Sequence, residues 1–170
     1  MYVRVAQQMS FYLSDANLAK SKFLQTELSK SVDPPWIPLD VFMKFNKLRG
    51  ILEEAFGRTE LQDLCKSLRS CPESGLQVKE DDDNGGGPKW VVKRTKPYVE
   101  KTNTDECTIY VQNIPSGSDQ DTLAKTFAVY GTVEYVSLPK YTTSQQLKGR
   151  SLVTHRLGGL GSFLTKILSL

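Results

Sequence analysis

The sequence predicts an α+β fold with two domains, and three observations support this prediction. Apolar residues recur with a helical period from the N-terminus to Leu68. The pattern then changes to that of a β-hairpin between Leu76 and Lys93. A charged segment without periodicity follows, and a second set of strands and one helix begins near Cys107. With 170 residues, the chain can bury one ordinary core or two small ones.

The first predicted helix begins at the N-terminus and has two faces. Its apolar face follows the i, i+3, i+4, i+7, i+11 spacing with Tyr2, Val5, Ala6, Met9 and Leu13. At ~100° per residue, a second face lies roughly 130° away from this stripe. That second face carries Gln8, Phe11, Tyr12 and Asp15, and its two aromatic rings have no obvious core to enter.

Three more helices are predicted before the hairpin. The second helix covers Lys20 to Ser29. After a short extended piece, Trp36 to Pro38, the third helix runs from Leu39 to about Leu48 and is ended by Gly50. The last helix has a clear period of 3.6 residues and is closed by a proline and a glycine. Its apolar residues and these two terminators are Leu61, Leu64, Cys65, Leu68, Pro72 and Gly75.

The predicted hairpin completes the first domain. Its strands are Leu76 to Lys79 and Trp90 to Lys93, and the acidic, glycine-rich loop Glu80 to Pro88 joins them. Helices followed by a β-hairpin with a long loop describe a winged helix, so we assign residues 1–96 to this domain. Residues 97–106 carry Pro97, several charges and no periodicity, and they are the predicted linker.

The second predicted domain, residues 107–155, begins with the strand Cys107 to Val111. A capping box of Ser118 and Asp121 then starts a helix that ends at Gly131. The inward-facing residues of this helix are predicted to be Leu123, Phe127 and Tyr130. Two further strands are Thr132 to Leu138 and Lys148 to Val153.

The order strand, helix, strand, strand is the first part of a ferredoxin-like RNA-recognition motif. That fold needs about 30 further residues for a second helix and a fourth strand, whereas 15 residues follow His155. We therefore expect an incomplete motif with a divergent tail at residues 156–170. One short helix over the sheet would account for the apolar residues of the tail, Phe163, Leu164, Ile167 and Leu168.

Charge and composition exclude several classes of protein. The net charge of +3 weakly favours a polyanionic partner. No run of about 18 apolar residues is present, so we expect an intracellular protein without a membrane segment. Three cysteines without a C-x-x-C spacing and a single histidine predict buried, reduced thiols and no metal site. Since neither a phosphate-binding glycine loop nor a catalytic constellation is present, we expect no enzyme and no cofactor.

Candidate binding residues are aromatic. Single-stranded RNA is bound mainly by stacking bases on aromatic rings, with polar side chains nearby. The segment Gln8 to Asn17, QMSFYLSDAN, supplies both kinds of residue, and Phe23 and Phe45 lie at the start and end of neighbouring helices. From spacing alone, Phe23 and Phe45 would more often be core residues. A winged helix that docks on a protein or on duplex DNA is the alternative, although Leu39 to Leu48 is mostly apolar.

Two segments resemble the La motif, the winged-helix domain of La and La-related proteins. These are Phe11 to Leu24, FYLSDANLAKSKFL, and Trp36 to Leu48, WIPLDVFMKFNKL. The resemblance covers about residues 4–96, and a following RNA-recognition motif is the arrangement of that family. Within the family, Glu134 to Gly149 resembles the La-related protein 7 subgroup. Since this likeness ends abruptly at Gly149, we expect an altered C-terminus from alternative splicing, a frameshift or a gene-model error.

The resemblance implies an RNA-binding protein of the nucleus. Such proteins hold the uridine-rich 3′ end of small non-coding, polymerase III type RNA within a ribonucleoprotein, and for the subgroup that RNA is 7SK small nuclear RNA or telomerase RNA. Carried over by position, the RNA-binding residues of this chain are Gln8, Phe11, Tyr12, Phe23 and Phe45, with Asn17 and Lys47 as lesser contributors.

Two departures from the family pattern concern RNA binding. The family has an aspartate where this chain has Ser21, which implies softer recognition of the 3′ end. In the second domain Tyr110 is the expected stacking ring. The other positions of the stacking surface are occupied by Arg150, Leu152 and His155, where aromatic residues are expected.

Overall fold

The computed structural model describes residues 1–30, 35–81, 89–100, 106–112, 114–115, 117–138 and 150–156, the last range by its backbone. The chain divides into two compact units, Met1–Glu100 and Lys101–Leu170. Several sequence expectations lie outside the described residues, namely the hairpin loop 82–88, the segment 139–149 and the tail 157–170.

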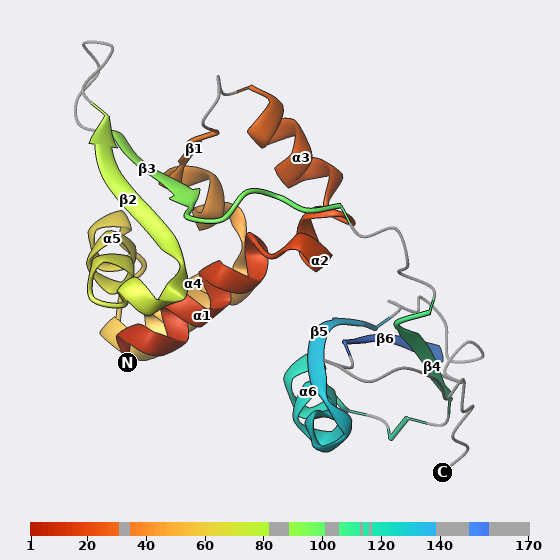
Figure 1. The fold of residues 1–170 in the computed structure, drawn as a ribbon. Coiled ribbons are helices and arrows are strands. Elements are labelled where there is room, and N and C mark those ends of the chain that lie inside the picture. The colour runs from red at the N-terminus through yellow and green to blue at the C-terminus, as the bar shows by residue number, and fades with distance from the viewer. Residues whose placement is uncertain are drawn as a thin grey trace. The chain divides into compact units, whose positions relative to one another are not determined.

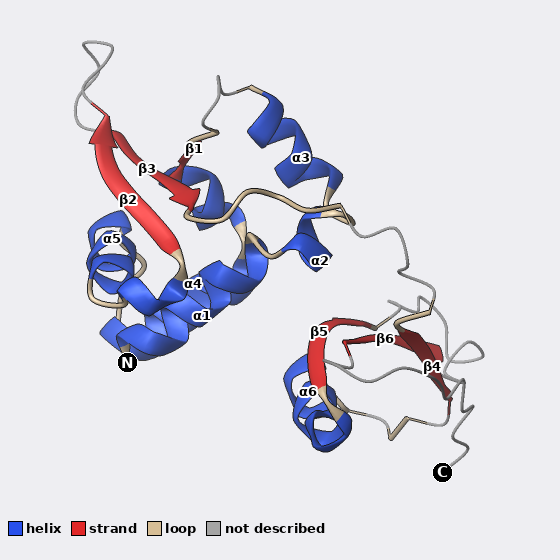
Figure 2. Ribbon diagram, in the orientation of Figure 1, coloured by secondary structure: helices blue, strands red, loops and turns tan. Residues whose placement is uncertain are grey.

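Most of the first unit is helical (Figures 1 and 2). Its helices and 3₁₀ segments are, in chain order, α1 (Tyr2–Tyr12), α2 (Asp15–Leu18), α3 (Lys22–Ser29), η1 (Leu39–Lys44), α4 (Asn46–Phe56), α5 (Leu61–Arg69) and η2 (Pro72–Ser74). A small sheet consists of β1 (Ile37–Pro38), β2 (Leu76–Asp81) and β3 (Lys89–Arg94). The strand order is β1-β3-β2, and both pairings are antiparallel.

The predicted apolar stripe of α1 is confirmed. Val5, Ala6, Met9 and Leu13 are buried in the core that α1, α4 and α5 share with η1 and the sheet. Helix α5 packs beside β2 (Figure 1), and its predicted residues Leu64, Cys65 and Leu68 are buried as well. The hairpin is also confirmed, with both strands longer than predicted and Val78 paired with Val92.

The predicted second helix is wrong in its start. Ser14 and Ser21 act as N-caps, because their hydroxyls accept hydrogen bonds from the backbone N–H groups of Asn17 (3.3 Å) and Leu24 (3.4 Å). Two caps seven residues apart divide this part of the chain into the short helix α2 and the helix α3, which begins at Lys22.

The predicted third helix is also wrong. Residues Leu39–Lys44 form the 3₁₀ helix η1, Phe45 is extended (φ −86°, ψ 114°), and α4 starts after it. Three-residue spacing of apolar side chains, as in Leu39 and Phe42, suits a 3₁₀ helix with three residues per turn. Gly50 lies inside α4, and this helix ends at Gly57 instead. The φ of Gly57 is 67°, which lies in the left-handed region that glycine adopts readily.

The second unit has strands β4 (Thr108–Gln112), β5 (Thr132–Ser137) and β6 (Arg150–Arg156), helix α6 (Gln120–Phe127) and the 3₁₀ turn η3 (Ala128–Tyr130). The strands pair antiparallel in the order β4-β6-β5. Among the described residues, its buried core consists of Val111, Leu123, Phe127 and Val136.

Two sequence expectations about α6 are wrong. The N-cap is Asp119, whose carboxylate accepts a hydrogen bond from the Thr122 N–H at 2.7 Å, and not Ser118. Leu123 and Phe127 are buried as predicted, but Tyr130 is 64% exposed. Because α6 ends at Phe127 and the chain tightens into η3, Tyr130 leaves the inward face that a continuous helix would have given it.

Candidate functional site

Five aromatic rings from α1, α3 and the η1–α4 junction meet in the first unit, and we call them the aromatic cluster: Phe11, Tyr12, Phe23, Phe42 and Phe45. Phe45 is central. Its ring stacks on Tyr12 with centroids 4.6 Å apart and meets the edge of Phe23 at 5.9 Å. The extended backbone of Phe45, between η1 and α4, places this ring at the junction of the elements.

Burial in the cluster changes gradually from core to surface. Phe42 is completely buried and Tyr12 is 7% exposed, whereas Phe11 and Phe45 are half-buried. Phe23 is 41% exposed. An aromatic face that is open to solvent but supported by buried rings can stack a planar base without rearrangement of the core.

Sequence reasoning erred on two members of this cluster. The ring of Tyr12 was expected to lack a core, but it is part of the core, because η1 and Phe45 cover the second face of α1. Phe42 was missed altogether. Its position three residues before Phe45 was the available signal, since a 3₁₀ turn brings residues i and i+3 to one side.

Gln8 lies beside these rings and is only 8% exposed. Its amide nitrogen Nε2 forms no hydrogen bond of good geometry, and among the buried side-chain polar atoms of the described residues only Ser74 Oγ shares this property. Burying an unpaired donor costs about 1–3 kcal/mol. A buried amide with an unpaired donor can therefore gain a hydrogen bond when an acceptor enters the site.

The phenol of Tyr12 is neutral at physiological pH. Burial raises the pKa of this phenol above its ordinary value of 10.0, while weak hydrogen-bond contacts from the Gln8 side chain and the Leu48 backbone to the phenol oxygen lower it. A neutral phenol can both donate and accept hydrogen bonds. The site thus combines apolar rings with uncharged polar groups, which suits a neutral, planar ligand group such as a nucleobase.

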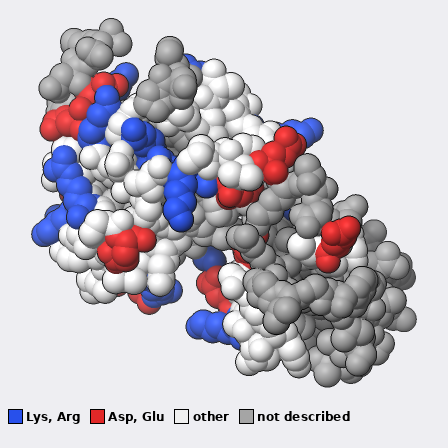
Figure 3. Space-filling model, viewed as in Figure 1, with Lys and Arg blue, Asp and Glu red and all other residues white. Residues whose placement is uncertain are grey.

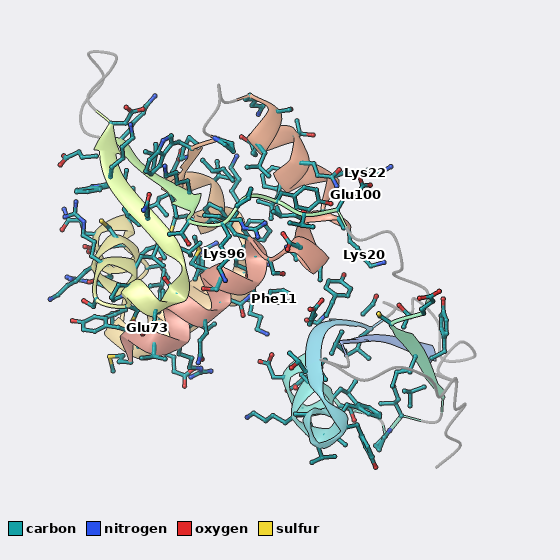
Figure 4. All side chains as sticks on the ribbon, viewed as in Figure 1. Phe11, Lys20, Lys22, Glu73, Lys96 and Glu100 are labelled. Atoms are coloured by element: carbon teal, nitrogen blue, oxygen red, sulfur yellow. The ribbon has the colours of Figure 1, made fainter. Side chains whose placement is uncertain are left out.

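The polar residues predicted around the cluster have structural contacts as well. Asn17 Nδ2 donates to the Tyr12 carbonyl at 2.8 Å and so holds α2 against the end of α1. Ser21 caps α3 two residues before Phe23, and the exposed Lys20 and Lys22 flank it (Figure 4). Lys47 is exposed in the first turn of α4.

Lys44 is a further cation at the cluster that sequence reasoning did not select. Its Nζ atom lies 5.9 Å from the centroid of Phe23, within the range of a cation–π contact. Lys44 precedes Phe45 directly, so the sequence signal was its position beside a chosen aromatic residue. Phe11 lies near the C-terminal end of α1 (Figure 4).

Asp15, predicted on the second face of α1, lies instead at the start of α2 and anchors the segment after β3. Its Oδ1 atom accepts hydrogen bonds from Arg94 Nη1 at 2.6 Å and from the Val99 N–H at 3.3 Å. Both side chains of the Arg94–Asp15 ion pair are mostly buried, since Arg94 is 18% and Asp15 is 25% exposed. The chain that leaves the sheet is therefore fixed beside α2.

Tyr110 lies in the second unit and is 61% exposed on β4, where its backbone pairs with Leu152. Its ring is open to solvent, as a stacking ring must be. The side chains of Arg150, Leu152 and His155 lie outside the described residues.

A hollow of about 300 Å³ in the first unit is lined by Gln62, Cys65, Lys66, Arg69, Ser70 and Trp90. None of the predicted site residues lines it. All three cysteines are free thiols; Cys65 and Cys71 are buried, but Cys107 is only half-buried. In the part of the chain that the structure describes, no group of His, Cys, Asp and Glu could hold a metal ion, and no helix is long and apolar enough to cross a membrane.

Comparisons with known proteins identify a La domain at residues 5–70. La-related protein 7 of Mus musculus is 29% identical over 150 residues, which are 88% of this chain and 24% of that protein. La-related protein 7 of Xenopus tropicalis is 27% identical over 88% of the chain, and the La protein homolog of Drosophila melanogaster is 26% identical over the same share. The chain thus spans about a quarter of the length of the first of these relatives.

Proposed function

The chain belongs to the La-related protein family, and on this basis we propose that it is an RNA-binding protein that holds the uridine-rich 3′ end of a small non-coding RNA. The observation that supports this most strongly is the aromatic cluster beside the unpaired amide of Gln8. The cluster offers stacking, and the amide offers recognition of a base edge.

The terminal bases stack on the exposed part of the aromatic cluster. Phe23 presents an open ring, and Phe45 supports it from the core side. Stacking of a base on an aromatic ring contributes about 1–3 kcal/mol per base. Two stacked bases would therefore provide enough affinity for a micromolar complex when phosphate contacts are added.

Gln8 gives the preference for uracil in this proposal. The edge of uracil presents carbonyl acceptors next to one N–H donor, and a glutamine amide can donate to the former and accept from the latter. Adenine has an amino donor where uracil has the O4 carbonyl, so it leaves the Gln8 donor unpaired when it enters in the orientation of uracil, although a glutamine amide can pair with other edges of adenine. Lys44 directly precedes Phe45, Lys47 follows it by two residues, and both supply positive charge for the phosphates.

The larger context is proposed from the family. We infer a nuclear ribonucleoprotein in which the chain stabilises a polymerase III type RNA, such as 7SK small nuclear RNA or telomerase RNA. The second unit, with its β4-β6-β5 sheet and the exposed Tyr110, is the proposed incomplete RNA-recognition motif and offers a further stacking ring.

Recognition of the 3′ end itself is expected to be weak in this chain. Ser21 cannot form the charge-assisted hydrogen bonds to ribose hydroxyls that a carboxylate forms, and the flanking Lys20 and Lys22 make this corner positive. A 3′-phosphate should therefore be tolerated. We expect oligouridine with a 3′-hydroxyl to bind the wild type only slightly better than the same RNA with a 3′-phosphate.

Replacing Ser21 with aspartate should restore end discrimination. Aspartate keeps the N-cap of α3, and each charge-assisted hydrogen bond contributes about 1.5–3 kcal/mol, so the 3′-hydroxyl preference should rise by roughly tenfold to a hundredfold. Titration of both RNAs by fluorescence anisotropy measures this ratio. Ser14→Asp is the matched control, because it adds the same charge at the N-cap of α2. Unchanged relative affinities in Ser21→Asp would reject the role of Ser21, and no binding of oligouridine by the wild type would reject the proposed function.

A further inference from the structure

The sheet of the first unit has one face in the core and one face outside it. Cross-strand partners lie on the same face, and successive residues alternate between faces. Val78 and its partner Val92 face the core. The pairs Gln77–Lys93 and Lys79–Val91 must therefore lie on the opposite, outer face, where Gln77 and Lys79 are exposed but Val91 is covered and only 4% exposed.

An aromatic ring with two cations occupies this outer face. Trp36 directly precedes β1, which pairs with β3, and its ring is half-buried. The Nζ atoms of Lys79 and Lys93 lie 4.8 Å and 4.7 Å from the centroid of this ring. We call Trp36, Lys79 and Lys93 the cationic sheet face. In Figure 3, lysine and arginine side chains lie over the region of the hairpin, and acidic side chains lie beside them towards its tip.

Among the described residues, one weak ion pair balances the charges of this face. The Asp81 carboxylate lies 3.9 Å from Lys79 Nζ, at the limit of an ion pair, and the side chain of Lys79 remains 49% exposed. Covering a tryptophan with lysine stems would bury apolar area, but two ammonium groups on one ring also repel each other. A ligand with repeated negative charges would relieve this repulsion.

We propose that the cationic sheet face binds the sugar–phosphate backbone of the RNA, upstream of the 3′ end that the aromatic cluster holds. This inference rests on the proposed function. Lysine ammonium groups bind phosphates as point charges and follow a flexible strand, and an indole ring accepts any base because stacking does not depend on sequence. Trp36 and Phe45 are nine residues apart and are joined through β1 and η1, both of which are packed on the core. One RNA could therefore contact both sites of the same rigid unit.

The experiment compares two RNAs on the full chain. One is a short oligouridine of about four nucleotides, chosen to fill the aromatic cluster alone, and the other has about 20 nucleotides and the same 3′ end. The variant is Lys79→Gln with Lys93→Gln. Two lost phosphate contacts lower the slope of log affinity against log salt by about 1.4 for a single strand, which is roughly a tenfold loss near 0.15 M salt. We expect this loss for the long RNA and unchanged binding of the short one.

Two further variants separate charge from structure. Lys79→Arg with Lys93→Arg keeps both charges and should retain binding of the long RNA. Lys66→Gln removes a lysine from another part of the unit, where its Nζ lies 5.8 Å from the ring of Tyr2. This variant should change the slope of log affinity against log salt much less than the double glutamine variant does. Three results would overturn the inference. The double glutamine variant could bind the long RNA as tightly as the wild type, or it could lose the same affinity for both RNAs. The double arginine variant could also bind the long RNA as weakly as the double glutamine variant.

The failures of the two proposals are distinguishable. If the wild type binds the long RNA but not the short one, and the glutamine pair weakens it, the cationic sheet face stands and the 3′-end site falls. If the wild type binds neither RNA, both fall. Polyglutamate serves as a model of an acidic protein segment. If Lys79→Gln with Lys93→Gln abolishes the binding of polyglutamate and leaves binding of the long RNA unchanged, the cationic sheet face binds an acidic protein segment and the RNA assignment is overturned.

Discussion

Replacing Phe23 with alanine is expected to weaken the binding of oligouridine by roughly 5- to 150-fold, the equivalent of the 1–3 kcal/mol that one stacked base contributes. Phe23 is 41% exposed and forms an edge contact with Phe45, so its ring faces both solvent and the cluster. Because the side chain is not part of the buried core, the free energy of unfolding should change little.

Two controls make this result specific. Phe23→Tyr keeps an aromatic ring and should retain most of the affinity. Tyr130→Ala removes a ring that is even more exposed, at 64%, from η3 of the second unit, and its affinity should stay near that of the wild type. If Phe23→Ala binds oligouridine as tightly as the wild type, base stacking does not take place on this ring.

Replacing Phe42 with alanine is expected to destabilise the first unit by about 3–5 kcal/mol, the usual cost of truncating a fully buried aromatic ring. Phe42 is 0% exposed, and its ring lies 6.3 Å from Tyr12 and 6.1 Å from Phe45. Domains of this kind have total stabilities of about 5–15 kcal/mol, so the loss is large. Since Tyr12 and Phe45 lose their support, binding of oligouridine should weaken with it.

Urea unfolding followed by tryptophan fluorescence measures this change. Both tryptophans of the chain, Trp36 and Trp90, lie in the first unit, so the signal reports on that unit. Phe42→Leu leaves most of the volume filled and should cost less than Phe42→Ala. A cost below about 1 kcal/mol for Phe42→Ala would mean that this ring does not pack as described.

The sequence predicted correctly those parts of the fold in which the spacing of apolar residues fits only one type of secondary structure. The stripe of α1, the stripe of α5 and the hairpin follow from spacing alone, because a single face of each element is buried. The break at Phe45 could not be found in this way. The apolar spacing from Leu39 to Leu48 continues through η1 and α4, so the periodicity hides the change of helix type.

Capping decided the other boundaries. Ser14 starts the short helix α2, which the sequence did not predict, and Ser21 starts α3 after the predicted Lys20, while Asp119 competes with Ser118 for the cap of α6. Which of several good capping residues is used depends on the packing of the helix that follows. The exposure of Tyr130 follows from the same uncertainty in the end of α6.

For the candidate site, the sequence indicated which residue types belong together but not how they are supported. Phe11, Tyr12, Phe23 and Phe45 do meet, although they come from three separate elements. The only sequence signal for the supporting ring Phe42 and the cation Lys44 was their position close to Phe45, and their contacts with the cluster depend on tertiary packing. The structural use of Asn17 and Ser21 in caps and turns was equally hidden.

The most direct test of the central claim is the affinity of the full chain for oligouridine compared with oligoadenosine of the same length, measured at one fixed salt concentration. With Gln8 held in the orientation that fits uracil, adenine leaves its donor unpaired at a cost of about 1–3 kcal/mol, so we expect oligouridine to bind tighter by roughly 5- to 150-fold. Equal affinity for both RNAs would contradict the assignment of the aromatic cluster and Gln8 to uridine recognition.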